Sequence, residues 1–267
     1  MKPNKIIFFL ALVTSLLQAE EFGDTFKIRI GGYLLSDNET TLSATTPYLV
    51  GAKINLKDDL GMETKTNVFR LDGHYRFSDV HKVEFAYYSI NTRGSNTISK
   101  DLNFDGATYQ AGANINSYLD MDIYKLNYAY SFYHNEKVEL SIGAGLHFMD
   151  ISTGLSGNAV IDNQPASFRS ESVDVLAPLP VIGFDLDYAV SPRFHIRGSI
   201  DYFGISIDKY SGSFTDVLIS ADYQAFDNFG MGLGLNVTNL DAKVDDTTKY
   251  ELNQTITGFL AYLSYNY

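Results

Sequence analysis

Cysteine is absent from this chain of 267 residues, and so is tryptophan. Without cysteine no disulfide can form, and a lipoprotein anchor is excluded. Prolines number only six, against 21 glycines, 18 phenylalanines and 19 tyrosines, and so aromatic a composition is not that of a disordered chain. Basic residues are also scarce: 20 Lys and Arg stand against 32 Asp and Glu, a formal net charge of −12. This balance argues against nucleic acid as a partner, which needs a basic surface.

Long apolar runs are missing too, apart from one at the N-terminus. Residues 6–17 are apolar except for Thr14 and Ser15, and they follow two lysines within the first five residues. This pattern predicts a signal peptide over residues 1–19, cleaved after Ala19, which leaves 20–267 as a single domain. The alternative, a transmembrane anchor, is disfavoured because the run is too short to cross about 30 Å of hydrocarbon.

The end of the chain alternates strictly. Phe259, Ala261, Leu263, Tyr265 and Tyr267 would lie on one face of a strand, since side chains alternate with a period of two. An apolar face ending in aromatic residues is typical of the closing strand of a bacterial outer-membrane β-barrel. Without tryptophan, any interfacial girdle of such a barrel must consist of tyrosine and phenylalanine.

Four short polar breaks separate strongly alternating runs, and we interpret them as periplasmic turns. They are residues 78–81, 134–137, 191–192 and 227–228. With both termini periplasmic, they divide the chain into ten strands. The predicted strands are 25–35, 67–77, 82–92, 121–133, 137–149, 179–190, 193–207, 214–226, 229–239 and 256–267.

The predicted fold class is therefore all-β: a closed antiparallel transmembrane β-barrel of about ten strands, with eight to twelve possible because 40–59 could hold another hairpin. Outer loops are expected at 36–66, 93–120, 150–178, 208–213 and 240–255. A soluble β-sandwich would also alternate, but its apolar face would form the core. The signal peptide, the strand lengths and the aromatic C-terminus favour the barrel.

The polar faces of these strands supply the candidate functional residues. Lys and Arg cost roughly 2–4 kcal/mol on the lipid face near the bilayer midplane, so they are expected to point inward and to find partners there. The predicted lumen network comprises Lys27, Arg29, Arg70, Asp72, His74, Arg76, Lys82, Glu84, Lys125, Glu139, Asp185, Asp187, Arg193, His195, Arg197, Asp201 and Asp222.

Basic and acidic side chains nearly balance in this set, which predicts a salt-bridged lumen. Eight strands leave an interior that side chains just fill, whereas sixteen leave an aqueous channel. Ten strands lie near the filled end, so we expect the lumen to be occluded at rest. A narrow path for small solutes is the alternative.

Catalysis and cofactor binding find little support. His81 and His134 fall in predicted turns, and the other three histidines face inward from different strands, without the convergent spacing of a metal site. His195 and Ser199 share a face but lie about 13 Å apart at strand rise, too far for a nucleophile–base hydrogen bond. We therefore predict no enzyme activity, no metal and no cofactor.

The predicted outer loops are acidic, for instance at Asp58, Asp59, Asp245 and Asp246. The simpler interpretation is a solvated surface; the other is bridging by divalent cations to lipopolysaccharide phosphates, since carboxylates suit hard cations. Residues 55–62 are a candidate for a short cap over the barrel mouth.

Two segments, RLDGHYRFSD (70–79) and DIYKLNYAYSFY (122–133), resemble the strand-and-turn repeats of small bacterial outer-membrane β-barrel proteins of the OmpA-barrel/OmpW-like class. The resemblance implies a Gram-negative source and contact with outer-membrane lipid and lipopolysaccharide. It also implies insertion by the barrel-assembly machinery, with Phe259, Leu263, Tyr265 and Tyr267 as the C-terminal signal. OmpW-like members suggest passage of small hydrophobic molecules, but they have eight strands and not ten. The oligomeric state is left open.

Overall fold

The computed structural model describes residues 24–45, 53–104, 107–161, 164–245 and 249–267. The predicted signal peptide, 1–19, lies outside the described residues. The described strands are β1 (Phe26–Thr45), β2 (Lys53–Asn55), β3 (Asn67–Ser78), β4 (His81–Thr97), β5 (Leu102–Phe104), β6 (Ala107–Tyr109), β7 (Asn114–His134), β8 (Val138–Ile161), β9 (Gln164–Ser191), β10 (Phe194–Ile207), β11 (Tyr210–Gln224), β12 (Phe229–Asp245) and β13 (Lys249–Asn266). In these residues no helix is long and apolar enough to cross a bilayer.

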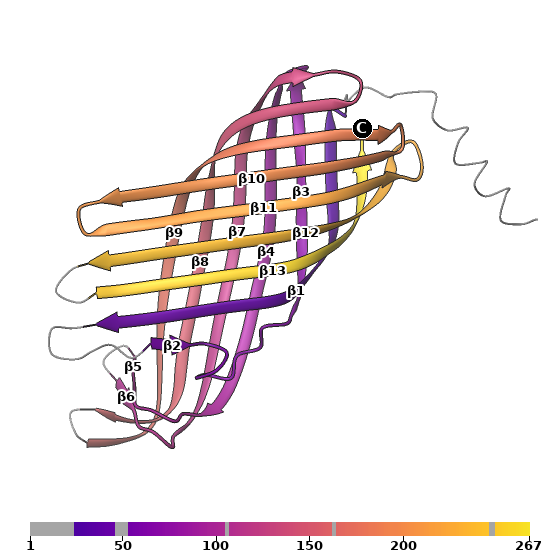
Figure 1. The fold of residues 1–267 in the computed structure, drawn as a ribbon. Helices are drawn as coiled ribbons and strands as arrows, with labels where there is room; N and C mark the ends of the chain where they lie inside the picture. The colour runs from indigo at the N-terminus through magenta and orange to yellow at the C-terminus, as the bar shows by residue number, and fades with distance from the viewer. Residues whose placement is uncertain (1–23, 46–52, 105–106, 162–163, 246–248) are drawn as a thin grey trace, which may run out of the picture.

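Ten of these strands form a closed antiparallel ring. The hydrogen-bonded order is β1, β3, β4, β7, β8, β9, β10, β11, β12 and β13, and β13 pairs with β1 again to close the barrel (Figure 1). The three short strands β2, β5 and β6 are attached outside this ring. The predicted fold class, ten strands and four short turns are confirmed. We call the end that carries these turns and the C-terminus the turn end, and the opposite end the outer end.

The strands are longer than predicted, and the expected loops at 93–120, 150–178 and 240–255 are largely strand. β8 and β9 alone span 24 and 28 residues. The sequence template counted only the 9–11 alternating residues needed to cross lipid. Backbone pairing needs no apolar alternation, so the ladders continue beyond the apolar band, where the outward face becomes polar.

The predicted alternation of faces is confirmed by the burial of the side chains. On β3, Phe69 is 57% exposed whereas its neighbours Val68 and Arg70 are buried. On β13, Leu263 is 68% exposed whereas Tyr262 and Ser264 are buried. In a protein without lipid around it, such exposed apolar side chains would be costly, so this outer face is the surface that a bilayer would cover.

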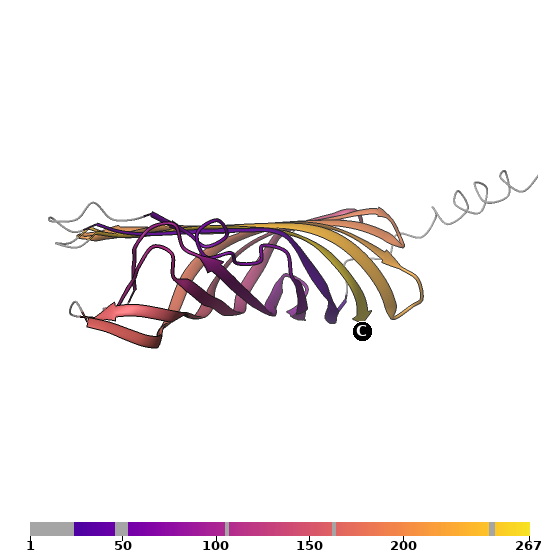
Figure 2. The ribbon, with the colours of Figure 1, turned by 90° about the horizontal axis from the view of Figure 1, so that it is seen from below.

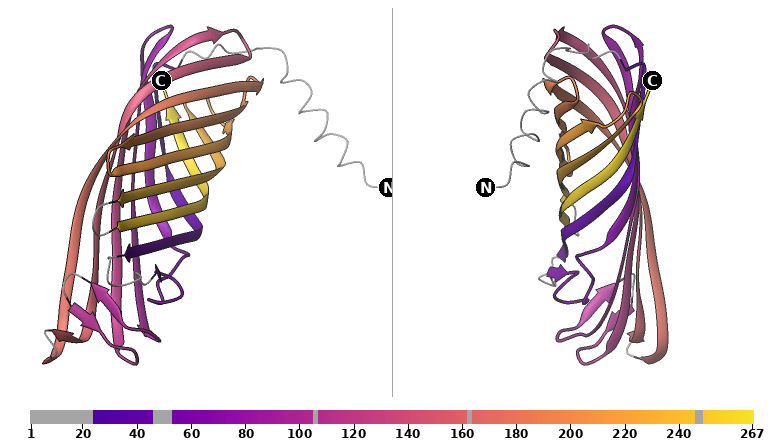
Figure 3. Two further views of the ribbon diagram at one scale, coloured as in Figure 1. Left: turned by 60° about the vertical axis from the view of Figure 1, so that its left-hand side comes forward. Right: turned by 90° about the vertical axis from the view of Figure 1, so that its right-hand side faces the viewer.

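At the outer end the barrel wall divides into two sheets. β1, β13, β12, β11 and β10 continue as a nearly flat sheet, while β4, β7, β8 and β9 curve away from it (Figures 1 and 2). The two sheets therefore diverge on both sides of the molecule, between β1 and β4 and between β9 and β10 (Figure 3).

The first of these gaps is covered by residues 53–66. Leu56, Leu60 and Met62 are buried in an apolar cluster with residues of β7 and β8. The backbone amide of Glu63 donates to the carbonyl of Arg93, and the Lys100 ammonium lies 2.9 Å from the Asp59 carboxylate. The segment that the sequence suggested as a cap therefore fills the space between β1 and β4.

Candidate functional site

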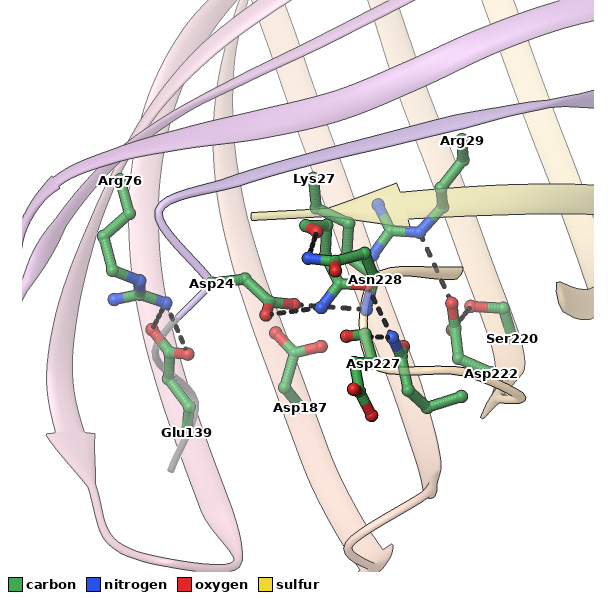
Figure 4. Close-up of polar contacts among 12 residues, drawn as sticks. Asp24, Lys27, Arg29, Arg76, Glu139, Asp187, Ser220, Asp222, Asp227 and Asn228 are labelled. Atoms are coloured by element: carbon green, nitrogen blue, oxygen red, sulfur yellow. Dashed lines mark hydrogen bonds and ion pairs between the residues drawn. The ribbon is translucent and has the colours of Figure 1, made fainter. Parts of the chain in front are cut away.

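The candidate site is the interior of the barrel, and its turn end is lined by ion pairs. Arg76 Nη2 lies 2.8 Å from both carboxylate oxygens of Glu139 (Figure 4). Lys82 is almost fully buried and contacts Glu84 at 3.2 Å and Asp187 at 3.7 Å. β3, β4, β8 and β9 thus each contribute a charge at the same end, because their inward residues alternate in matching register.

A second group of charges lies between β1 and the C-terminal strands. Arg29 Nε is 3.5 Å from Asp222 Oδ1 (Figure 4). The Tyr262 hydroxyl donates to the same carboxylate at 3.0 Å. Lys27 is 3.6 Å from Asp24, which also accepts a hydrogen bond from Asn266. These contacts join the first and last strands of the ring from the inside.

Further along the lumen, Asp216 is the residue that sequence reasoning missed. Its carboxylate is buried, lies 2.9 Å from Lys125 Nζ, and accepts hydrogen bonds from Thr238 at 2.7 Å and Asn236 at 3.1 Å. The available signal was its spacing, six residues before Asp222, which places both on the inward face of β11.

Arg70 lies beside this group. Its guanidinium carbon is 5.0 Å from the centroid of the Tyr88 ring and 5.9 Å from that of Tyr33, both fully buried. Such cation–π contacts hold a positive charge against an apolar surface. Arg70 therefore lies where the charged part of the lumen, on the side of the turn end, meets the buried aromatic rings.

His147 is fully buried on β8, 3.5 Å from Asp201 and edge-on to Phe214. Among the described residues neither of its ring nitrogens has a hydrogen-bond partner, whereas Asp201 accepts a hydrogen bond from Asn127 at 3.1 Å. His74 and His195 are half-buried on β3 and β10. The three inward histidines therefore stay on separate parts of the wall.

Three more predicted residues, Asp72, Asp185 and Arg197, line an interior cavity of about 40 Å³ together with Arg70 and Glu84. A water molecule needs roughly 10–15 Å³ by this measure, so the cavity has room for a small water cluster. In the described residues no group of three or more His, Asp or Glu side chains is placed to hold a metal ion.

Arg193 is the exception among the predicted lumen residues. It precedes Phe194, the first residue of β10, and it is exposed in the turn. The shift in the β9–β10 ladder skips Val190 on β9 and leaves the faces of β10 unchanged; Arg193 is exposed because it lies in the turn before that strand. Alternation could not show where the turn ends, and this assignment is corrected.

A cluster of buried apolar side chains, which we call the apolar layer, lies inside the barrel; it overlaps the level of the innermost charges and extends from there toward the outer end. Every strand of the ring except β10 contributes a buried residue to it: Tyr33, Leu35, Val68, Tyr88, Ile90, Met121, Ile123, Met149, Val181, Phe214, Leu218, Leu240, Ile256, Leu260 and Tyr262. Along β7, for example, the inward series runs from Lys125 to Ile123 and Met121. Sequence reasoning collected only the charged inward residues and overlooked this layer.

The predicted C-terminal signal residues face outward. Phe259, Leu263, Tyr265 and Tyr267 are all exposed, and Tyr265 packs against Phe229 with ring centroids 5.2 Å apart. The backbones of Phe26 and Tyr267 exchange two hydrogen bonds of 2.9 Å. The last residues therefore complete the ladder between β13 and β1 that closes the barrel.

The fold is similar to that of several outer-membrane proteins of known structure. The outer-membrane protease OmpT from Escherichia coli has a TM-score of 0.61 at 13% identity, covering 94% of this chain and 99% of its own. The toluene transporter TodX from P. putida has a TM-score of 0.40 at 8% identity, covering 91% of this chain and 90% of that one. Ail from Yersinia pestis has 0.32 at 14%, covering 88% and 97%. No protein-family model matches the sequence, and no curated protein matches it.

These similarities concern the fold. With its closed ring of ten antiparallel strands, the chain shares the architecture of the outer-membrane β-barrel OmpT. OmpT is a protease, but a structural similarity at 13% sequence identity concerns the fold and does not extend to that activity.

Proposed function

We propose that this protein is an integral outer-membrane β-barrel with a lumen occluded at rest, and that it acts as a structural or surface-interaction protein. In this proposal the outward apolar face meets outer-membrane lipid, and the outer end reaches past lipopolysaccharide to the cell exterior. Residues 1–19 direct secretion and are removed, and the barrel-assembly machinery inserts the chain through β13.

The observation that carries the proposal is the succession of two different obstructions. Ion pairs such as Lys125 with Asp216 cross the lumen, and the apolar layer around Tyr33, Tyr88 and Phe214 extends from their level toward the outer end. An ion that passed the charges would have to lose its hydration shell in the apolar layer, and burying an unpaired charge is very costly.

Conductance in planar bilayers tests this proposal. The refolded full-length protein is expected to give low or intermittent conductance, compared with a general porin inserted under the same conditions. A large and steady conductance would contradict the occluded lumen.

The alternative function is a narrow path for small solutes, and one observation favours it. Arg70 and Asp72 line both the 40 Å³ cavity and a smaller one of about 10 Å³, so two small spaces lie next to each other along one side of the wall. Uptake of small neutral or hydrophobic solutes into liposomes, with no ion conductance, would favour this alternative.

An enzymatic role is not part of the proposal. All five histidines lie in the described residues and on strands of the ring. Each is at the turn end or faces the interior of the barrel, away from the outer mouth. A hydrolase at the cell surface would need an activated nucleophile within reach of solvent and substrate. Assay of the refolded protein against peptide and phospholipid substrates would test this point.

A further inference from the structure

The second gap at the outer end, between β9 and β10, has a specific cause in the sequence. The ladder between these strands runs from Phe194 with Ser191 to Tyr202 with Ile182, and then stops. β10 continues to Ile207 and β9 continues outward to Gln164, but they separate (Figure 1). Had the register continued, Gly204 would face Pro180 and Ser206 would face Pro178. We call this opening the seam.

The direction of the backbone groups explains why the ladder ends there. The amide of Ala189 donates to Lys137 on the β8 side, so even-numbered residues of β9 turn their backbone groups toward β10. Pro180 and Pro178 are the next two even positions after Ile182, and proline has no N–H. Two successive hydrogen bonds from β9 to β10 therefore cannot form, and the strands diverge.

The two edges of the seam are protected unequally. Natural edge strands are commonly guarded by proline or by charged side chains, and the β9 edge carries two prolines. The carbonyl of Arg193, the residue before β10, accepts a hydrogen bond from Gln224 on the β11 side, so the even-numbered residues Gly204 and Ser206 direct their N–H and C=O groups into the seam. In the described residues Phe203–Ile207 pair only with β11. The β10 edge is thus unguarded.

Apolar side chains lie next to this edge. Ile205 and Ile207 continue the inward face on which Phe203 packs against the apolar layer, but they are 40% and 62% exposed because β9 has turned away. Tyr210, opposite Ile207 on β11, is 53% exposed. The seam therefore combines free backbone donors and acceptors with an exposed apolar row, which is the surface that an added strand covers.

We propose that the β10 edge of the seam binds an extended segment of another polypeptide by strand addition. This inference deepens the proposed surface-interaction function and rests on it. The partner segment pairs antiparallel with Gly204 and Ser206, carries N–H groups where β9 has prolines, and places alternate apolar side chains against Ile205 and Ile207.

Two other occupants fit less well. The segment before Asp24 joins the barrel at the turn end, the opposite end from the seam. A second copy in the same membrane would be related by a two-fold axis along the membrane normal, and its β10 would run outward in the same direction. The two copies of β10 would then run parallel, not antiparallel, and their axes would cross at twice the tilt of the strand, which does not suit a continuous hydrogen-bond ladder.

A peptide-binding experiment tests the proposal on the refolded full-length protein in nanodiscs. The probe is a fluorescent peptide that copies residues 174–182 with alanine in place of both prolines, and the control peptide keeps the prolines. Fluorescence polarisation is expected to show binding of the alanine peptide and at least tenfold weaker binding of the proline peptide. Equal binding of the two, or no binding of either, would overturn the proposal.

Variants of the barrel separate strand addition from mere apolar contact. Ser206→Pro removes a seam-facing N–H and is expected to weaken binding at least tenfold, whereas Ser206→Ala keeps the N–H and the affinity. Pro178→Ala with Pro180→Ala restores two donors to β9, so the seam should zip closed and the peptide should no longer bind. Retained affinity in both Ser206→Pro and the double alanine variant would contradict strand addition.

Engineered disulfides report the state of the seam, against a background without native cysteine. Ile182→Cys with Tyr202→Cys should cross-link, and Leu179→Cys with Ile205→Cys, which leaves both prolines in place, should not. Cross-linking of the second pair in the absence of peptide would show a closed seam and overturn the proposal. A dimer of the wild type that Ser206→Pro abolishes would assign the edge to a second copy and also overturn it. Failure of the occluded-lumen function would appear separately, as steady conductance of the wild type.

Discussion

Lys125 on β7 and Asp216 on β11 meet across the interior of the barrel, with 2.9 Å between Nζ and Oδ2, and both side chains are at least nine-tenths buried. The strands that carry them are not neighbours in the ring. The contact therefore spans the lumen, and it joins opposite parts of the wall that share no backbone hydrogen bonds.

Breaking this pair from one side is expected to destabilise the barrel strongly. Asp216→Ala would leave the Lys125 ammonium buried without its partner, at a cost of about 3–5 kcal/mol. Replacing both, as Lys125→Met with Asp216→Leu, should cost clearly less. Unfolding titrations in urea from lipid vesicles measure the difference. Glu251→Ala, which breaks the exposed pair with Lys243, serves as the control and should change stability by about 0–1 kcal/mol.

The lipid-facing band predicts a position-dependent cost on a single strand. Leu233 on β12 is 68% exposed within the apolar band, and Leu233→Arg should destabilise by roughly 2–4 kcal/mol if it lies near the bilayer midplane. Asn239 lies on the same face of β12 but beyond the band, so Asn239→Arg should be nearly neutral. Equal effects of the two substitutions in vesicle unfolding titrations would mean that the band is misplaced.

The apolar layer predicts which substitutions open the lumen. Tyr33 and Tyr88 pack edge to face with ring centroids 5.8 Å apart. Tyr33→Ala with Tyr88→Ala should let water into the layer and raise the single-channel conductance severalfold over the wild type. Arg197→Ala alone should raise it less, because the apolar layer stays in place. If the arginine variant opened the barrel more than the tyrosine variants, the charges would be the principal barrier.

The closing ladder predicts a role for the last three residues in assembly. Deleting Tyr265 to Tyr267 removes the pairs that join Ile28 to Tyr265 and Lys27 to Asn266, and an unpaired strand edge is not tolerated in hydrocarbon. The truncated chain should fail to show heat-modifiable migration on gels after refolding into lipid. Tyr210→Ala, which removes an aromatic side chain at the outer end, should refold normally. Normal refolding of the truncated chain would argue against this role.

Period-two alternation determined most of the barrel, because each strand has one face toward lipid and one toward the lumen. The inward positions of Arg70, Lys82 and Glu139 follow from parity alone, and so does the number of strands between the four polar turns. The same alternation places Asp216 on the inward face of β11, with Leu218, Ser220 and Asp222. It does not show that the partner of Asp216 is Lys125, on a strand four places away in the ring. Which inward charges pair depends on the shear of the closed barrel, and local sequence does not encode that quantity.

The separation of β9 and β10 at the outer end is a second feature that the sequence alone could not predict. The two prolines at 178 and 180 are visible in the sequence, yet whether they split the wall depended on which way their backbone positions face. That direction is set by the register of β9 on β8, a tertiary property. The alternation of apolar and polar residues by itself determined an outer-membrane-type barrel, since solvation of the two faces is a local matter. Only the tertiary structure decided that apolar side chains cluster inside the barrel, that residues 53–66 cover one gap, and that the strands at the other gap separate. Each of these depends on groups that come together from distant parts of the chain.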